Sequence, residues 1–140
     1  MTFDFQLYLT GTSRIIRSSS AAGVPRSRIV LLGFSQGACL AAEFTVCNAS
    51  RFGGLIVFSG GLIGEPGTTW DFDGHFHGTP VFLGCSDVDA HIPVPRIRES
   101  AEVFTHMGAD VMLRLYAGMG HLVNDDEVLV AQRMLDAAVS

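Results

Sequence analysis

The segment 29–44 constrains the fold of this 140-residue chain more than any other. It begins with a short run of branched apolar residues, Ile29–Leu32, which is typical of a buried strand covered on both faces. The next five residues, 33–37, read GFSQG and fit the pattern G-x-S-x-G. The residues that follow are apolar almost all round, with only Glu43 charged, which indicates a helix in the core of an α/β domain. The segment therefore predicts a strand, a sharp turn and a helix, with Ser35 at the turn.

A turn of this kind suits a nucleophilic serine. The hydroxyl is a weak nucleophile, so it must be held where a base and a substrate can both reach it. A tight strand-to-helix turn does this, but it strains the serine backbone and brings the strand close to the helix. We expect Gly33 and Gly37 to remove side chains that would collide there. We also expect the backbone N–H of Gln36, at the helix start, to point toward a developing oxyanion.

The rest of the chain alternates between predicted strands and helices. We expect helices over 3–22, from the turn to about Asn48, over 95–107 and over Asp125–Val139, and strands over Leu55–Ser59, Val81–Gly84 and Val111–Tyr116. The last helix starts with a capping box of Asn124 and Glu127, and its inward face is predicted to be Val128, Ala131, Leu135 and Ala138. Arg114 places the fourth strand near the sheet edge. This alternation of strands and helices predicts one α/β domain over 1–140, with a parallel sheet of about four strands and flanking helices.

The serine needs a base, and the base needs an acid that orients it. Functional groups collect at the carboxyl ends of the strands in an open parallel sheet. Asp87, Asp89 and His91 follow the third strand, and His121 follows the fourth strand in a glycine-rich turn. The order Ser35, Asp89, His121 is the order of nucleophile, acid and base in α/β-hydrolases.

His121 is the preferred base, and His91 is its rival because it follows the same strand as the acid. Asp87 is interpreted as a supporting or turn-forming residue. His75 and His77 lack a third ligand at metal spacing, so we expect neither zinc nor another metal ion.

The segment 61–79 is a glycine-rich loop that is long for a compact domain, so it is expected to be either functional or partly mobile. It carries Trp70, Phe72 and Phe76. These aromatic side chains could line an acyl pocket, or they could pack against the domain, and the sequence leaves both open.

Composition excludes several classes of protein. The net charge is −5 and all nine cations are arginine, without a basic cluster, which argues against binding to nucleic acid or to anionic membrane surfaces. The three cysteines, Cys39, Cys47 and Cys85, show no metal-binding spacing and are interpreted as free thiols that fill the core. No apolar run approaches the roughly 18 residues of a membrane span, and no signal peptide is evident. We therefore expect a cytoplasmic protein without stable membrane insertion.

Three motifs together, GFSQG, SDVDAHIP and YAGMGH, resemble the phospholipase/carboxylesterase family of α/β-hydrolases. That family includes acyl-protein thioesterases, lysophospholipases and bacterial carboxylesterases, and the resemblance runs from about Val24 to the C-terminus. It implies Ser35 as the nucleophile and His121 as the base of a G-M-x-H turn. Residues 89–93 match the family's D-P-x-x-P with alanine at its second position, which implies Asp89 as the acid.

The resemblance implies a serine esterase or thioesterase that needs no cofactor. Its substrates would be acyl esters, lysophospholipids or acyl thioesters. Family members begin with further strands and a loop that resembles the site of a second oxyanion donor, so this chain looks like the C-terminal two-thirds of such a hydrolase. Half of the oxyanion hole would then be absent, and the strand before Ser35 would have an open edge that a second copy could pair with. The alternative is a truncated, weak or inactive domain that acts as an interaction piece or fragment.

Overall fold

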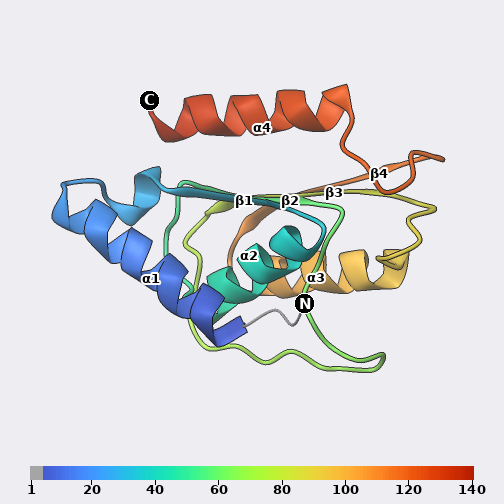
Figure 1. Cartoon of the computed structure of the whole chain (residues 1–140), viewed down its shortest axis with the longest axis horizontal. Helices are drawn as coiled ribbons and strands as arrows, with labels where there is room; N and C mark the ends of the chain where they lie inside the picture. The colour runs from blue at the N-terminus through green and yellow to red at the C-terminus, as the bar shows by residue number, and fades with distance from the viewer. Residues whose placement is uncertain (1–4) are drawn as a thin grey trace.

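A four-stranded parallel sheet separates two layers of helices (Figure 1). The computed structural model of the chain describes residues 5–140. The strands are β1 (Val30–Phe34), β2 (Gly54–Phe58), β3 (Pro80–Ser86) and β4 (Asp110–Tyr116), and they lie in that order across the sheet. The helices are α1 (Phe5–Ala21), α2 (Gln36–Cys47), α3 (Val94–His106) and α4 (Asp125–Ala138), with a short 3₁₀ turn η1 (Arg26–Arg28) before β1. The predicted α/β fold and its number of strands are confirmed; of the predicted helix 3–22, residues 3 and 4 lie outside the described part.

The helical layers are unequal. Figure 1 shows α1, α2 and α3 on one face of the sheet and α4 alone on the other. The larger core lies under the first three helices and is closed by fully buried aromatic side chains, Phe52, Phe76 and Phe104. The smaller core lies under α4 and consists of Ile56, Phe58, Phe82, Val130 and Ala131.

The strand that precedes Ser35 is less buried than its sequence predicts. β1 and β4 are the two edge strands, which agrees with the expectation from Arg114. Because α4 packs on β2 and β3, it leaves part of β1 uncovered. Leu32 and Phe34 are consequently 52% and 42% exposed, so the prediction that both faces of this strand are covered was wrong.

The last helix has the predicted start but a different inward face. The side chain of Asn124 accepts from the Glu127 N–H at 2.8 Å, and Glu127 accepts from the Asn124 N–H at 3.1 Å, so the capping box is confirmed. Asp126 accepts hydrogen bonds from Arg114 and Tyr116, both at 2.7 Å, which join the first turn of α4 to β4. The helix packs through Val130, Ala131 and Met134, so Ala131 is buried as predicted. Val128 and Leu135, which were also predicted to face inward, are 55% and 42% exposed.

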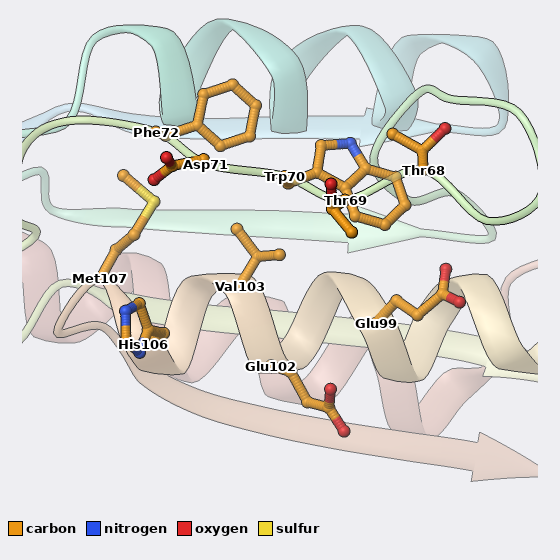
Figure 2. Close-up of a pocket in the computed structure, with 10 residues that line it drawn as sticks. All are labelled: Thr68, Thr69, Trp70, Asp71, Phe72, Glu99, Glu102, Val103, His106 and Met107. Carbon is orange, nitrogen blue, oxygen red and sulfur yellow. The ribbon is translucent and has the colours of Figure 1, made fainter.

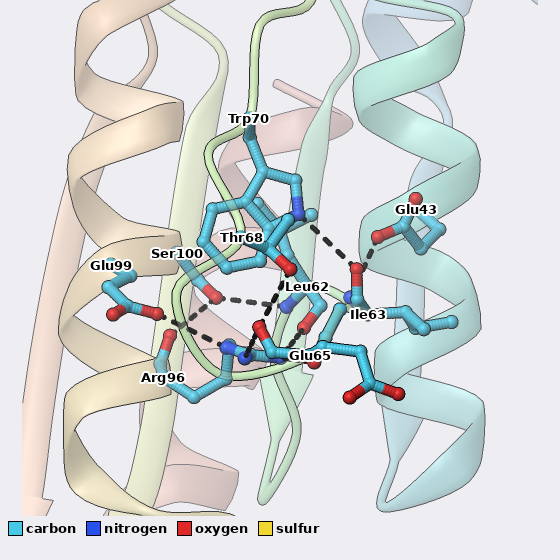
Figure 3. A network of polar contacts seen from close by, with 10 residues as sticks. Glu43, Leu62, Ile63, Glu65, Thr68, Trp70, Arg96, Glu99 and Ser100 are labelled. Atoms are coloured by element: carbon cyan, nitrogen blue, oxygen red, sulfur yellow. Dashed lines mark hydrogen bonds and ion pairs between the residues drawn. The ribbon is translucent and has the colours of Figure 1, made fainter.

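The loop 61–79 is anchored by a network of polar contacts around Arg96 of α3 (Figure 3). The Arg96 guanidinium donates to the carbonyls of Leu62, Gly64 and Glu65 at 2.6–3.1 Å, and it lies 4.9 Å from the centre of the Trp70 ring. From the other side, Glu43 of α2 accepts from the Ile63 N–H at 2.7 Å. These contacts fix the first half of the loop between two helices.

Replacing Arg96 by methionine, which keeps the length of the side chain, is expected to release this part of the loop. Three carbonyls lose a charged donor, so the free energy of unfolding should fall by about 2 kcal/mol. Hydrogen exchange should accelerate at the amides of residues 62–65 and remain unchanged in the sheet. Arg98→Met on the exposed side of the same helix is the control; equal exchange in the two variants would contradict the anchoring role.

The cysteines occupy three different environments. Cys85 is buried, Cys39 is half-buried and Cys47 is exposed, and all three are free thiols. The expectation that each fills the core was therefore wrong for Cys47. Separately, none of the helices within residues 5–140 has the length and the apolar character needed to cross a bilayer.

Candidate active site

The residue at the turn between β1 and α2 has a strained backbone. Ser35 has φ 57° and ψ −119°, in a region that side-chain-bearing residues rarely adopt. Its N–H donates to the Phe58 carbonyl of β2 at 2.9 Å, and its carbonyl accepts from the Cys39 N–H at 3.1 Å. The neighbouring strand and the helix together hold the turn, so the hydroxyl is presented at the carboxyl end of the sheet.

The two glycines of the motif are not equivalent. A Cβ at Gly33 would overlap the backbone carbonyl of Gly37, so the strand and the helix can approach only because residue 33 has no side chain. A Cβ at Gly37 would have no atom within 4 Å among the described residues. The expectation of a collision is therefore met at Gly33, and at Gly37 it was wrong.

The structure brings the three predicted side chains into one hydrogen-bonded chain. Ser35 Oγ lies 2.8 Å from His121 Nε2, and His121 Nδ1 lies 2.7 Å from Asp89 Oδ2. Ser35 follows β1, Asp89 follows β3 and His121 follows β4. Because the strands are parallel, their carboxyl ends all lie at the same end of the sheet. Since a carboxylate can only accept, Nδ1 carries the proton toward Asp89, and Nε2 is free to accept from the serine O–H.

The environment of Asp89 keeps its carboxylate charged. Burial alone would raise the pKa of Asp89, but hydrogen bonds from the His121 ring and from the N–H groups of His91 and Ile92 outweigh it, so the pKa lies below its ordinary value. Cys85 contacts the same carboxylate at 3.8 Å. Burial, followed by the charge of Asp89, raises the pKa of the Cys85 thiol to about 12, so this neighbour remains a neutral donor.

The rival base lies beside His121 and is not bonded to the serine. The ring of His91 is 4.5 Å from the ring of His121, centre to centre, and the backbone N–H of His91 donates to Asp89 at 2.7 Å. Asp87 accepts from the Gly118 N–H at 2.9 Å and so holds the loop that carries His121, in agreement with a supporting role.

Gln36, the predicted oxyanion donor, is the first residue of α2. Its N–H has no acceptor within the helix, and it lies at the positive end of the helix dipole. The position next to Ser35 is therefore suited to an oxygen that gains negative charge.

A groove with a volume of about 570 Å³ lies between the loop 61–79 and α3 (Figure 2). Its apolar walls are Trp70, Phe72, Val103 and Met107, and it includes none of Ser35, Asp89 and His121. Trp70 and Phe72 thus flank this separate groove, and Phe76 is fully buried in the core. None of these three aromatic side chains therefore lines an acyl pocket at Ser35. Among the residues that the structure describes, no cluster of His, Cys, Asp and Glu could hold a metal ion.

Two buried hydroxyl groups around the triad were missed by sequence reasoning. Ser59, which follows β2, donates to the Leu122 carbonyl at 3.5 Å, and Ser86, at the end of β3, accepts from the Gly120 N–H at 2.9 Å. A serine at the end of a strand is too common a feature to indicate such a contact from sequence.

The chain is similar in sequence to known hydrolases. The sequence profile of the Phospholipase/Carboxylesterase family matches residues 4–139. Acyl-protein thioesterase 1 of Gibberella zeae is 31% identical over 118 residues, which cover 81% of this chain and 49% of that protein. The corresponding protein of Saccharomyces cerevisiae is 28% identical over 131 residues, with 89% and 56% covered. The chain therefore spans about half the length of these curated relatives.

Solved structures show the same fold. The crystal structure of a phospholipase/carboxylesterase from Dyadobacter fermentans aligns with a TM-score of 0.83 and 36% identity, over 94% of this chain and 62% of that chain. Arabidopsis thaliana SOBER1 aligns with a TM-score of 0.80 at 18% identity, over 99% of this chain and 68% of that chain. At this low identity the likeness shows the fold alone. The fold is that of the α/β-hydrolases. Since the family profile matches nearly the whole chain, the chain belongs to the phospholipase/carboxylesterase family.

Proposed function

We propose that this chain is a serine hydrolase that cleaves carboxylic esters or thioesters through an acyl-enzyme on Ser35. The observation that carries the proposal is the continuous hydrogen-bonded chain from Ser35 Oγ through His121 to Asp89, with separations of 2.8 and 2.7 Å. Family membership supports the same reaction class. We further propose that residues 1–140 form one domain.

In this mechanism His121 Nε2 takes the proton of Ser35 while Oγ attacks the acyl carbon. The N–H of Gln36 donates to the oxyanion of the tetrahedral intermediate. The protonated imidazole then gives its proton to the leaving alcohol or thiol, and a water molecule, activated by His121 in the same way, releases the acid. Asp89 remains ionised throughout, because hydrogen bonds lower its pKa, and stabilises the imidazolium.

The proposed substrates are acyl esters, lysophospholipids and acyl thioesters. The relatives named acyl-protein thioesterase favour an acyl group on sulfur, and those named carboxylesterase favour an ester. Phe34 is 42% exposed, and its ring centre lies 5.0 Å from that of His121. This ring would contact the acyl chain or leaving group beside the attacked carbon.

The alternative is that the chain is a weak or inactive hydrolase domain that acts through its sheet edge. Among residues 5–140, β1 pairs with β2 on one side only, and the side chains of Leu32 and Phe34 are half exposed. Such an edge is a template for a further strand, so we propose that a second copy pairs with it to form a homo-oligomer.

Covalent labelling with a fluorophosphonate, read by intact mass, tests the hydrolase proposal. The probe reacts with a serine that has an adjacent base, so we expect one adduct on the wild-type chain and none on Ser35→Ala. Ser19→Ala is the matched control, because this exposed hydroxyl donates to the carbonyl of Ile15 in its own helix and so is not aimed at a base.

The active hydrolase and the inactive interaction domain predict different results in this experiment. An adduct that Ser35→Ala removes and Ser19→Ala retains supports the hydrolase, and relative kcat/KM on a matched aryl ester and thioester then identifies the preferred class. If circular dichroism shows that the chain is folded and it still takes no adduct, the hydrolase proposal is excluded. The proposal of an inactive domain that acts through its sheet edge would then remain.

A further inference from the structure

One buried hydroxyl oxygen joins the two loops that carry the acid and the base. Ser86 is the last residue of β3 and is fully buried. Its Oγ accepts from the Val88 N–H at 3.1 Å and from the Gly120 N–H at 2.9 Å. Val88 immediately precedes Asp89, and Gly120 immediately precedes His121. The same oxygen therefore fixes the residue before each of the two side chains that must meet.

The loop that carries His121 depends on such contacts because it has no regular structure of its own. Gly118 and Gly120 have φ of 64° and 78°, in the left-handed region, and the segment between β4 and α4 is made of turns and bends. Contacts from other elements hold it at alternate residues: Asp87 at Gly118, Ser86 at Gly120 and Ser59 at Leu122. Ser86 differs from the other two because its oxygen also binds the turn of the acid.

We propose that Ser86 is a positioning residue that sets the separation and direction between the Asp89 carboxylate and the His121 ring; this inference rests on the proposed hydrolase function. Ser86 does not touch Ser35, so it acts only through the two loops. Without its oxygen, the N–H groups of Val88 and Gly120 lose the acceptor that they share, so the two loops are no longer tied to one point and can shift. A shift of about 1 Å in a catalytic geometry can cost roughly 100-fold in rate.

The kinetic test compares Ser86→Ala with Thr79→Val. Thr79 directly precedes β3, at the end opposite Ser86, and is equally buried. Its hydroxyl oxygen accepts from the Phe52 N–H at 2.9 Å. Both variants remove a buried hydroxyl acceptor. We expect Ser86→Ala to lower kcat by roughly 10- to 100-fold with KM almost unchanged, and Thr79→Val to keep the wild-type kcat. Ser86→Thr, which retains the oxygen, should restore most of the rate.

A spectroscopic test does not depend on turnover. The proton between His121 Nδ1 and Asp89 Oδ2 should give a far-downfield resonance in the proton NMR spectrum, because the hydrogen bond is short and one partner is charged. We expect this resonance to be sharp in the wild type and in Thr79→Val, and to broaden or move upfield in Ser86→Ala. A folded Ser86→Ala that retains both the resonance and kcat would overturn the proposal.

The two measurements separate failure of this inference from failure of the proposed function. A wild-type chain that shows the resonance but hydrolyses neither esters nor thioesters contradicts the hydrolase assignment, and Ser86→Ala still tests the positioning role through the resonance. A wild-type chain without the resonance overturns the positioning role itself.

Discussion

Replacing His121 with glutamine is expected to lower kcat for ester hydrolysis by roughly 10⁶-fold, because a nucleophile and its base act as one unit. Glutamine keeps polar atoms in the side chain but cannot take the proton of Ser35, whose Oγ lies 2.8 Å from the imidazole. Activity that remains would come from substrate binding and the oxyanion donor alone. Single-turnover measurements with an activated aryl ester would resolve rates this low.

The double variant and a neighbouring histidine provide the controls for this prediction. Asp89→Asn alone should cost roughly 10⁴-fold, but added to His121→Gln it should cost little more, since the unit is already broken. His91→Gln removes a ring that lies 4.5 Å from His121 without a hydrogen bond to Ser35, so we expect a loss below about tenfold. Equal losses in His91→Gln and His121→Gln would mean that the base has been assigned to the wrong residue.

Gly33→Ala is expected to destabilise the folded chain by about 3 kcal/mol or more. The added methyl group would overlap the backbone carbonyl of Gly37, and backbone cannot move aside as a flexible side chain can. Relief of the clash requires the strand and α2 to separate, which also moves Ser35. Urea unfolding followed by circular dichroism, together with the yield of soluble protein, would measure the effect.

Gly37→Ala is the matched control from the same turn. The methyl group meets no atom within 4 Å, and alanine is favoured over glycine inside a helix by up to about 1 kcal/mol. We therefore expect this variant to be as stable as the wild type or slightly more stable. Similar destabilisation in both variants would show that the turn is sensitive to any added atom and not to the specific contact at residue 33.

The sequence allowed prediction of those features that depend on local rules and on topology. The turn at Ser35 follows from the glycine spacing and the apolar segments on either side of it. Ser35, Asp89 and His121 come together because each follows a strand of one parallel sheet, and the carboxyl ends of parallel strands lie at the same end of the sheet. Their catalytic roles stay a prediction until the labelling and kinetic experiments are made.

Features that depend on a particular tertiary neighbour could not be predicted in this way. Ala131 of α4 is buried as predicted, but Val128 and Leu135 are exposed, because the helix packs on β2 and β3 through Val130 and Met134 and helical periodicity alone does not specify which residues meet the sheet. The exposure of Leu32 and Phe34 depends on where α4 lies across the sheet. The role of Ser86 depends on two backbone N–H groups, which carry no signature in the sequence.

The order of the three residues along the chain also determines when Ser35 becomes reactive during synthesis. The base lies 86 residues after the nucleophile and 32 residues after the acid. A nascent chain that has emerged only as far as α3 carries the strained turn and the acid turn, but no base. Ser35 would then remain inert until the His121 loop has docked on the end of β3. Covalent labelling of a ribosome-bound chain would therefore time the final step of tertiary assembly, which the appearance of helices and strands does not report.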